Sequence, residues 1–286
     1  MITSAYDVFR CNNEIEPRFI NYFYQSIDDV KGLKPYYTGL RKVVRSDTFL
    51  GITFFLPPLS EQNKISDYLD RKTQQIDDLI EKTERKIELL KEQRSSLINQ
   101  CVTKGLDPNV EMKDSGVEWI GEIPKGWKIT KSKFISTFIN GYSFKSDNWK
   151  ETGIPVIRMS NIGVDGKLNI TEKNLRFVDE TTFELAKNFQ IKKGDILICM
   201  TDMNPKMLWL GSTVRFNEEE KYLLNQRVGI TRINDAEVDI VFYSYLSNTS
   251  FVKNQLKTSV YPNVQTNLSV DPIRNSILLL PPLSEQ

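Results

Sequence analysis

Histidine is missing from all 286 residues of the chain. Histidine is the commonest general base and metal ligand, so its absence excludes Ser-His and Cys-His nucleophile arrangements and weighs against an enzyme. The three cysteines, Cys11, Cys101 and Cys199, are far apart, which indicates neither a disulfide framework nor a CxxC metal motif. We therefore expect a reduced protein with no metal and no cofactor.

Long apolar runs are also missing. No stretch is apolar enough to span a bilayer, and the N-terminus has no signal-peptide core. The 38 basic and 37 acidic side chains nearly cancel, so net charge points to no class of partner. These features predict a cytoplasmic protein that does not contact a membrane. Its length is enough for two domains or one large one.

One sequence, LPPLSEQ, occurs twice, at 56–62 and at 280–286. With one gap, Phe19–Tyr22 also matches Phe242–Tyr245. Such a fixed offset indicates a duplicated unit. At the first copy, LGITFFL at 50–56 is typical of a buried strand, which the two prolines then end.

A long helix is predicted over 59–105, with Ser60 as its N-cap and Gly105 after its last turn. Apolar residues recur at steps of three and four, the heptad pattern of a helix that pairs with another helix. The expected interface residues are Leu69, Ile76, Ile80, Ile87, Leu90 and Leu97, with Thr73, Thr83 and Arg94 as polar interruptions. At about 1.5 Å per residue, such a helix is a rod of about 60 Å.

Residues 106–280 predict a mixed α/β (α+β) domain joined to this coiled-coil-forming helix. The expected strands are 154–159, 195–201, 211–216, 229–233 and 276–280, and the expected helices are 180–187 and 239–256. About 170 residues are enough for a sizeable core.

The chain resembles the specificity subunit of type I restriction-modification systems. The resemblance is carried by the PPLSEQ joint before a long charged helix, and by SGVEWIGEIPKGW at 115–127, NGYSFKSDNW at 140–149, GIPVIRMSNI at 153–162, KKGDILICMT at 192–201 and LLNQRVGIT at 223–231. Each segment alone is weak evidence for the resemblance, but together the segments cover most of the chain in the order found in the family.

The resemblance implies two target-recognition domains, each followed by a long helix. The two helices pack antiparallel, each domain binds one half of a split site in double-stranded DNA, and the subunit docks methyltransferase subunits, which bind the restriction-translocase subunits. On that pattern, 1–58 is the C-terminal part of a first recognition domain and 59–105 is the spacer helix. Residues 106–280 are then a complete recognition domain, and 281–286 start a truncated second helix.

Basic side chains predominate between residues 123 and 163, with seven bases and two acids. Such an excess can face phosphates, although the residues alone favour a solvated face balanced by Glu218-Glu219-Glu220 elsewhere. The candidate DNA-binding residues are Tyr142, Ser143, Lys145, Arg158, Asn161, Lys206, Gln265 and Asn267. Arginine can bind guanine and asparagine or glutamine can bind adenine, while the lysines suit phosphates.

Structural roles compete for several positions. Tyr142 and Phe144 can be core anchors, Asn161 can be a turn residue, and turn chemistry competes at Gln265 and Asn267. Asn225-Gln226-Arg227 favours a hydrogen-bonded scaffold over base contact, and Trp209 favours the core.

Two other functions remain open. A DNA methyltransferase with a fused recognition domain would need an Asp/Asn-Pro-Pro-aromatic turn and a cofactor loop, and the proline pairs here lie between leucines. A truncated subunit that forms a homodimer through its helix would supply two helices and two recognition domains. We expect a non-catalytic DNA-binding subunit, with the homodimer as the alternative.

Overall fold

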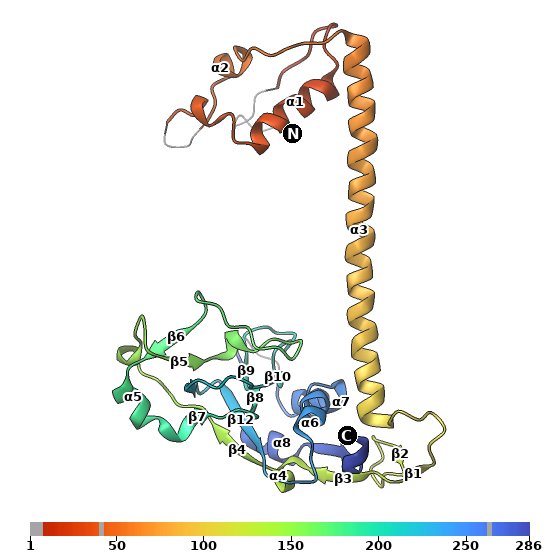
Figure 1. The fold of residues 1–286 in the computed structure, drawn as a ribbon, viewed down its shortest axis with the longest axis vertical. Coiled ribbons are helices and arrows are strands. Elements are labelled where there is room, and N and C mark those ends of the chain that lie inside the picture. Colours follow the sequence, from red (N-terminus) through yellow and green to blue (C-terminus); the bar gives the residue numbers. More distant parts are fainter. Residues whose placement is uncertain (1–7, 40–42, 262–264) are drawn as a thin grey trace. The chain divides into compact units, whose positions relative to one another are not determined.

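The structure is a computed structural model that describes residues 8–39, 43–261 and 265–286 (Figure 1). It divides into two compact units, Met1–Leu90 and Lys91–Gln286. The mixed α/β architecture and the long helix α3, which contributes residues to both units, agree with the predicted fold class.

The first unit is helical. It contains α1 (Pro17–Asp29), the 3-10 helix η1 (Lys34–Tyr36), α2 (Ser46–Leu50) and the first part of α3 (Leu59–Lys104). Helix α3 begins one residue before the predicted cap, Ser60, and Gly105 follows its last turn with a φ of +83°. A positive φ costs glycine little, so Gly105 ends the helix as predicted.

Polar contacts hold α1 against α3. Arg18 Nη1 donates to Asp67 at 2.9 Å and to Asp70 at 2.7 Å, and the Tyr22 hydroxyl donates to Asp70 at 2.7 Å. The hydrogen bonds from Tyr22 and Arg18 lower the pKa of Asp70. Helix α1 therefore packs on α3 through charge and hydrogen bonds, and none of its residues is fully buried.

The prediction of a buried strand at 50–56 is wrong. Leu50 ends α2, residues 52–58 are irregular, and Phe55 is fully exposed. The corresponding residues of the second copy do form a strand, β14 (Ile277–Leu280), which pairs with β3 (Lys128–Lys131). No described residue of the first unit offers an equivalent partner, and a strand without a partner leaves its backbone groups unpaired.

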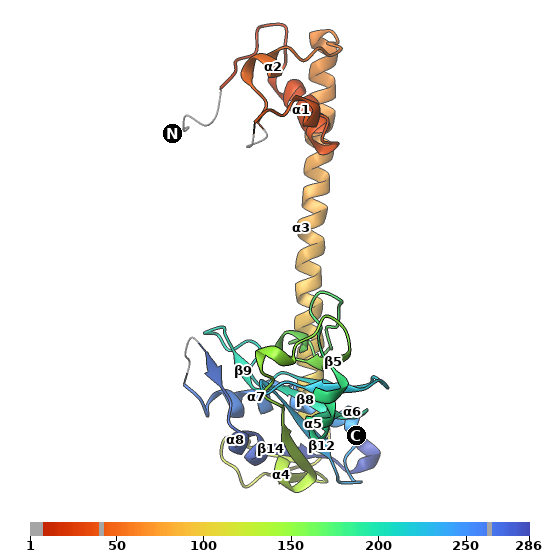
Figure 2. The same cartoon turned by 90° about the vertical axis from the view of Figure 1, so that its left-hand side faces the viewer.

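The second unit is built on two four-stranded sheets. One has the order β10-β8-β12-β4 and is antiparallel throughout, and the other has the order β6-β5-β11-β7 with β5 and β11 parallel. Figure 2 labels β8 and β12 of the first sheet and β5 of the second. The strands of these sheets are β4 (Ser136–Asn140), β5 (Ile154–Ile157), β6 (Arg176–Val178), β7 (Gln190–Ile191), β8 (Ile196–Cys199), β10 (Thr213–Arg215), β11 (Tyr222–Leu224) and β12 (Val228–Ile233).

Three two-stranded pairs complete the strands: β1 (Met112–Asp114) with β2 (Glu122–Pro124), β13 (Thr266–Asn267) with β9 (Thr201–Asp202), and β14 with β3. The helices are α4 (Ser132–Ile135), α5 (Glu180–Leu185), α6 (Ile240–Ser247), α7 (Ser250–Lys257) and α8 (Val270–Asn275), with 3-10 turns η2 (Ser146–Asn148), η3 (Met159–Asn161), η4 (Lys187–Phe189) and η5 (Leu283–Glu285). Within the second unit, each predicted strand has a counterpart: β5, β8, β10 and β14 are shorter than predicted, and β12 is one residue longer. Helix α5 is also shorter than its predicted range.

The helix predicted over 239–256 is two helices. Asn248 ends α6, and Thr249 caps α7 by accepting a hydrogen bond from the Val252 N–H. Threonine is a favoured N-cap, so a new helix begins here although the apolar pattern continues across the break.

The main core lies between the antiparallel sheet and helices α6 and α7. Ile196 and Ile198 from the sheet pack with Phe242, Leu246 and Leu256 from the helices, and all five are buried. Ile98 and Val102 from the last turns of α3 also pack against this core. The end of α3 is thereby fixed to the rest of the second unit.

The two LPPLSEQ copies end in glutamines with matching hydrogen bonds. Gln62 accepts from the Glu16 N–H at 2.9 Å and donates to the carbonyls of Glu14 and Pro57. Gln286 accepts from the Asp239 N–H at 2.7 Å and donates to the carbonyls of Glu237 and Pro281. Glu16 and Asp239 are the N-caps of α1 and α6, so the duplication extends to this hydrogen-bonded joint.

Candidate nucleic-acid interface

The loop after β4 is held to the neighbouring sheet by its backbone. The Tyr142 N–H donates to the Leu224 carbonyl at 2.7 Å, and the Gln226 N–H donates to the Tyr142 carbonyl at 3.0 Å. The half-buried Tyr142 ring lies 4.9 Å from the Phe144 ring and 5.3 Å from the Phe189 ring, measured between centroids. The aromatic rings anchor the loop, while Ser143 and Lys145 are exposed on it.

Gly141 is required by a close backbone approach at the start of this loop. A Cβ atom there would lie 2.1 Å from the Asn225 carbonyl oxygen and 2.8 Å from that of Val228. These are backbone atoms that no rotamer change can move. Only glycine therefore admits the close approach of the turn between β11 and β12.

Arg158 lies in a small pocket whose other cationic side chain is Arg227. The pocket has a volume of about 300 Å³ and is lined by Phe144, Trp149, Arg158, Met159, Ser160, Asn225, Gln226 and Arg227. We call it the arginine pocket. The Arg158 Nη2 donates to the Asn174 carbonyl at 3.2 Å, but its Nε is buried with no hydrogen-bond partner among the described residues.

The guanidinium of Arg158 therefore lacks a counter-charge within the described chain. Burial and the nearby Arg176 both lower the pKa of Arg158. A buried cation beside a second cation is costly unless an anion binds there. The geometry suits a phosphate or the O6 and N7 atoms of guanine, both of which accept from an arginine fork.

Arg227 and Arg176 were not predicted. Asn225 has the scaffold role expected for its segment, since its N–H donates to the Ile157 carbonyl at 3.0 Å and its Oδ1 accepts from the Arg227 N–H at 3.3 Å. The exposed Arg227 projects from the turn that Asn225 builds. Only the fold brings the ends of β5, β6 and β11 together, so no sequence signal connects these three arginines.

Asn161 has the turn role that competed with base contact. Its side chain is fully buried, its Oδ1 accepts from the Arg158 N–H at 2.9 Å, and its Nδ2 donates to the Asn169 carbonyl at 3.2 Å. Both ends of the amide are engaged with backbone. Asn161 thus shapes the loop that carries Arg158 and has no free edge for a base.

Lys206 is exposed on the loop between β9 and β10. Buried Asp202 organises this loop by accepting from the N–H groups of Asn204 at 2.7 Å, Trp209 at 2.6 Å and Leu210 at 3.1 Å. The expectation that Trp209 belongs to the core is wrong, because 38% of the residue is exposed. The loop that Asp202 fixes thus exposes both an aromatic side chain, Trp209, and a lysine, Lys206.

Gln265 and Asn267 lie beside this loop. Asn267 belongs to β13, which pairs with β9, and its Oδ1 accepts from the Thr201 hydroxyl at 2.9 Å. Both side chains are exposed, and the Gln265 amide donates weakly to Asn267 at 3.5 Å. Within the described residues, only the Oδ1 atom of the Asn267 side chain is hydrogen-bonded, so its amide nitrogen can donate to another partner.

These loops form one surface. A groove of about 970 Å³ is lined by the segment from Met159 to Asn169 and by the loop that contains Asp202, Asn204, Pro205 and Trp209. Met159 and Ser160 line both this groove and the arginine pocket. The structure thus joins Arg158 with the loop of Lys206 and, through the β9–β13 pair, with Gln265 and Asn267.

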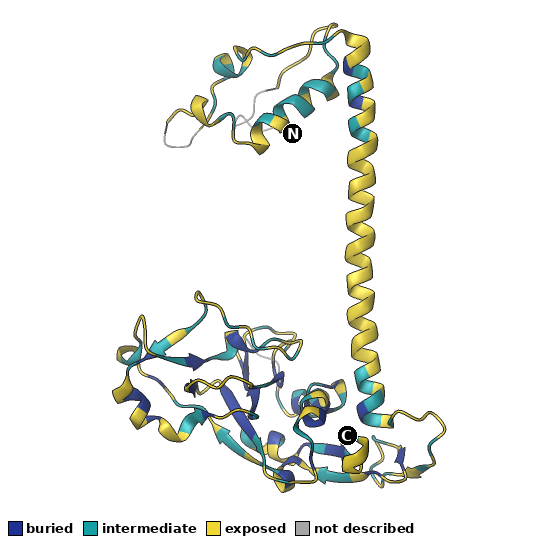
Figure 3. Ribbon diagram, in the orientation of Figure 1, coloured by how far each residue is buried: buried dark blue, intermediate teal, exposed yellow. Residues whose placement is uncertain are grey.

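The predicted helix-interface residues are solvent-facing on this chain. Ile76, Ile80, Ile87, Leu90 and Leu97 are between 47% and 59% exposed, and Leu69 is half-buried (Figure 3). An apolar row of this length on a helix leaves a large hydrophobic surface uncovered.

The described ranges contain neither a metal-binding cluster nor a membrane-spanning helix. No group of three or more acidic, cysteine or histidine side chains is placed to hold a metal ion. In the same residues, no helix combines the length and apolarity that crossing a membrane requires.

The fold is that of restriction-system specificity subunits. The HsdS subunit from Thermoanaerobacter tengcongensis superimposes with a TM-score of 0.51 at 18% identity, covering 95% of this chain and 60% of that one. A chain from a structure of a type I R-M system, solved to explain complex assembly and conformational transition, gives a TM-score of 0.60 at 18% identity, covering 96% and 62%.

Residues 124–286 match the family model of the type I restriction modification DNA specificity domain, which is more than half of the chain. The chain belongs to this family. It is 27% identical over 253 residues to the type I restriction enzyme MjaVIII specificity subunit of Methanocaldococcus jannaschii, and 23% identical over 249 residues to the EcoKI specificity subunit of Escherichia coli. These matches cover 87% and 85% of this chain but 56% and 50% of the relatives, so the chain spans about half of their length.

Proposed function

We propose that this chain is a DNA sequence-recognition component of a type I restriction-modification complex and catalyses no reaction itself. The recognition domain, about residues 106–280, binds one half of a split target in double-stranded DNA. The observation that carries the proposal is Arg158, a partly buried guanidinium that forms no ion pair within the described residues. It shares its pocket with Arg227, and the pocket is continuous with the loops that expose Lys206 and Trp209. DNA supplies the negative charge that no residue lining this pocket provides.

Within this proposal the contacts divide into two kinds. Ser143, Lys145 and Lys206 are exposed on loops and suit phosphates, which position a protein on the duplex. Arg158, Gln265 and Asn267 present fork or amide groups that can read base edges. Tyr142 supports its loop from the core side, and Asn161 supports the loop of Arg158.

The test is a selection from duplexes with a randomised central segment, using the full chain together with its methyltransferase subunits. We expect repeated rounds to enrich one short sequence, because base-edge contacts discriminate by about 1–3 kcal/mol per good bidentate pair. A version of the chain with Arg158 and Lys145 both replaced by alanine serves as the control. Recovery of sequences no different from the starting pool would refute the recognition role.

We also propose that the apolar row on α3 packs against a second helix and that the paired helices dock the methyltransferase subunits, through which restriction-translocase subunits join. The uncovered surface of Ile76, Ile80, Ile87 and Leu97 supports this. The second helix comes from the remainder of a longer protein or, in the alternative function, from a second copy of this chain. Because a complex that recognises genomic DNA must have access to the genome, we place the complex in the cytoplasm.

Replacing Ile80 and Ile87 by glutamate is expected to abolish assembly with the methyltransferase subunits while leaving the thermal unfolding of the isolated chain unchanged. Each isoleucine contributes about 1.5–3 kcal/mol when fully buried at a helix pair, and a carboxylate there is unpaired. The matched control is Lys82→Glu with Lys86→Glu, which changes charge on the same turns outside the row. Size-exclusion chromatography of the complex provides the measurement, and intact assembly would contradict the prediction.

Sedimentation of the chain alone separates the two sources of the second helix. A dimer at micromolar concentration that the glutamate variant converts to monomer supports the homodimer. A monomer in both cases assigns the partner helix to another part of a longer protein.

A further inference from the structure

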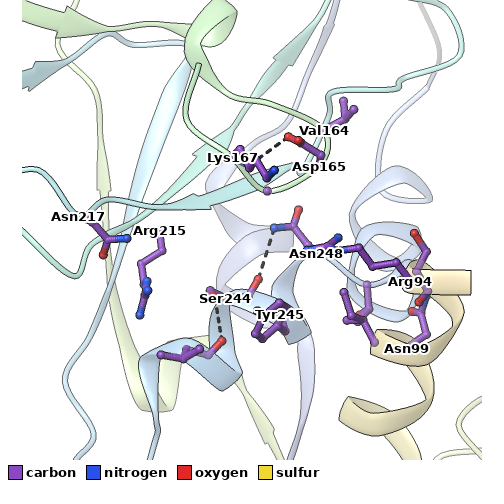
Figure 4. Close-up of a pocket in the computed structure, with 15 residues that line it drawn as sticks. Arg94, Asn99, Val164, Asp165, Lys167, Arg215, Asn217, Ser244, Tyr245 and Asn248 are labelled. Carbon is purple, nitrogen blue, oxygen red and sulfur yellow. Dashed lines mark hydrogen bonds between the residues drawn. The ribbon is translucent and has the colours of Figure 1, made fainter. Parts of the chain in front are cut away.

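A second cationic pocket lies where the end of α3 meets the recognition domain. Its volume is about 320 Å³, and its cationic side chains are Arg94 on α3, Lys167 on the loop after η3, and Arg215 at the end of β10 (Figure 4). We call it the junction pocket. One carboxylate, Asp165, lines it as well, and the remaining lining is mainly hydroxyl and amide side chains.

The three cations have no protein counter-charge. Within the described ranges, none of Arg94, Lys167 and Arg215 forms an ion pair or a side-chain hydrogen bond. The nearby Asp165 Oδ1 instead accepts from the backbone N–H of Lys167 at 3.2 Å. Surface cations in proteins commonly lack partners, but three that converge on one concavity against a single carboxylate make a positive field there.

Hydrogen bonds fix the walls of the pocket. Asn99 Oδ1 accepts from both the N–H and the hydroxyl of Ser250 at 3.2 Å, which joins α3 to α7. Asn248 Oδ1 accepts from the Thr213 N–H at 3.0 Å, and its Nδ2 donates to the Thr213 carbonyl at 2.6 Å, which joins α6 to β10. The cations therefore project from backbone held in place before any ligand binds, which reduces the entropy lost on binding.

Gly166 brings the loop of Lys167 close to this wall. Its φ is +81°, and a Cβ atom on it would lie 3.3 Å from Asn248 Nδ2. Glycine is thus favoured both by the backbone conformation and by the close approach. The loop that supplies Lys167 is held next to the helices that supply the other walls.

The junction pocket is continuous with the candidate nucleic-acid interface. Val164, Asp165 and Lys167 line both this pocket and the groove that leads to the arginine pocket. A linear polyanion lying along the groove reaches Arg94 without leaving the surface. A protein partner is less well matched, because the pocket has few apolar side chains to form the buried centre of an interface.

We infer that Arg94, Lys167 and Arg215 bind the phosphodiester backbone of DNA outside the recognised half-site, so that the end of α3 is itself a DNA-contacting element. This inference rests on the proposed function and extends it to the part of the duplex that the recognition loops do not read. It also explains why an arginine interrupts the heptad pattern at position 94. Arg94 lies in the same heptad row as Leu90 and Leu97, which are exposed, and it lines the junction pocket at the end of that row.

The test compares the full chain, with its methyltransferase subunits, to the Arg94→Ala and Lys167→Ala double variant. The probe is a random-sequence duplex of about 40 base pairs, and affinity is measured as a function of salt. Each phosphate contact contributes about 0.9 to the slope of log affinity against log salt, so the double variant is expected to lose about 1.8. Alanine suits the helix at position 94, so the fold is retained. Arg85→Ala with Lys86→Ala removes two cations from α3 outside the pocket and should leave the slope unchanged.

The outcomes separate the inference from the proposed function. Enrichment of one sequence by the wild type with an unchanged slope in the variant overturns the inference alone. A reduced slope without any sequence preference supports the inference and overturns the proposed recognition. An unchanged slope with lost methyltransferase assembly assigns the pocket to an acidic protein surface and overturns the inference. Failure of the wild type to bind any duplex overturns both.

Discussion

Arg158→Met is expected to weaken DNA binding by about tenfold to a hundredfold while leaving the thermal midpoint unchanged or raised. Affinity falls because a guanidinium fork contributes about 1–3 kcal/mol at a base edge, and 1.4 kcal/mol corresponds to a factor of ten. Stability is retained because methionine keeps most of the volume beside Phe144 and Met159 and removes a buried Nε that has no partner. Fluorescence anisotropy on a selected duplex and a thermal melt measure the two effects.

The matched control for Arg158 is Lys113→Ala. Lys113 is an exposed cation on β1 and lines neither the arginine pocket nor the groove. The Lys113→Ala substitution removes the same formal charge as Arg158→Met. We therefore expect neither the DNA affinity nor the melting temperature to change appreciably. A melting temperature that falls in the Arg158 variant while DNA affinity is kept would show that Arg158 is a structural residue, contrary to the proposal.

Asp195→Ala is expected to lower the free energy of unfolding of the second unit by about 3 kcal/mol. The Asp195 carboxylate is only 3% exposed, and it accepts from Arg232 Nε and Nη2 at 2.7 Å each and from the Lys192 N–H at 2.7 Å. Breaking a buried pair costs about 3–5 kcal/mol because the remaining charge is uncompensated. We expect the lower end, since the Arg232 side chain is 30% exposed and can recruit water.

Glu219→Ala is the control for this ion pair. Glu219 pairs with Lys193, which lies two residues before Asp195, but the side chains of both Glu219 and Lys193 are more than half exposed. Exposed pairs contribute about 0–1 kcal/mol, so urea denaturation should show little change. Equal losses in the two variants would mean that burial does not set the strength of these pairs. Asp195 begins the strand predicted over 195–201, and the buried strand β8 starts at the next residue.

Elements with a local pattern were predictable from sequence. The heptad repeat and Gly105 define α3 within one or two residues, and the apolar run ILIC defines β8. The strand at 50–56 was mispredicted for a non-local reason. Its residues resemble those of β14, but β14 is a strand because β3 pairs with it, and pairing partners leave no mark on the segment itself.

The candidate DNA-binding residues also separate into those that a local sequence signal identifies and those that only the tertiary fold brings together. Lys145, Lys206, Gln265 and Asn267 were selected as polar residues on predicted loops, and the structure places all four in exposed positions. Asn161 was selected for the same reason, as a polar residue. It is nevertheless buried, because its loop folds back so that its side chain donates to the backbone carbonyl of Asn169. Arg227 and the junction pocket depend on segments more than fifty residues apart, whose proximity only the tertiary fold creates.

The joints at Gln62 and Gln286 depend on main-chain atoms alone. All three hydrogen bonds of each glutamine go to main-chain atoms, so the joint requires a backbone path and no particular side chain from the residues around it. The side chains around each joint can then diverge without loss of these hydrogen bonds. A duplicated sequence of seven residues thereby keeps one local backbone geometry in two different sequence contexts.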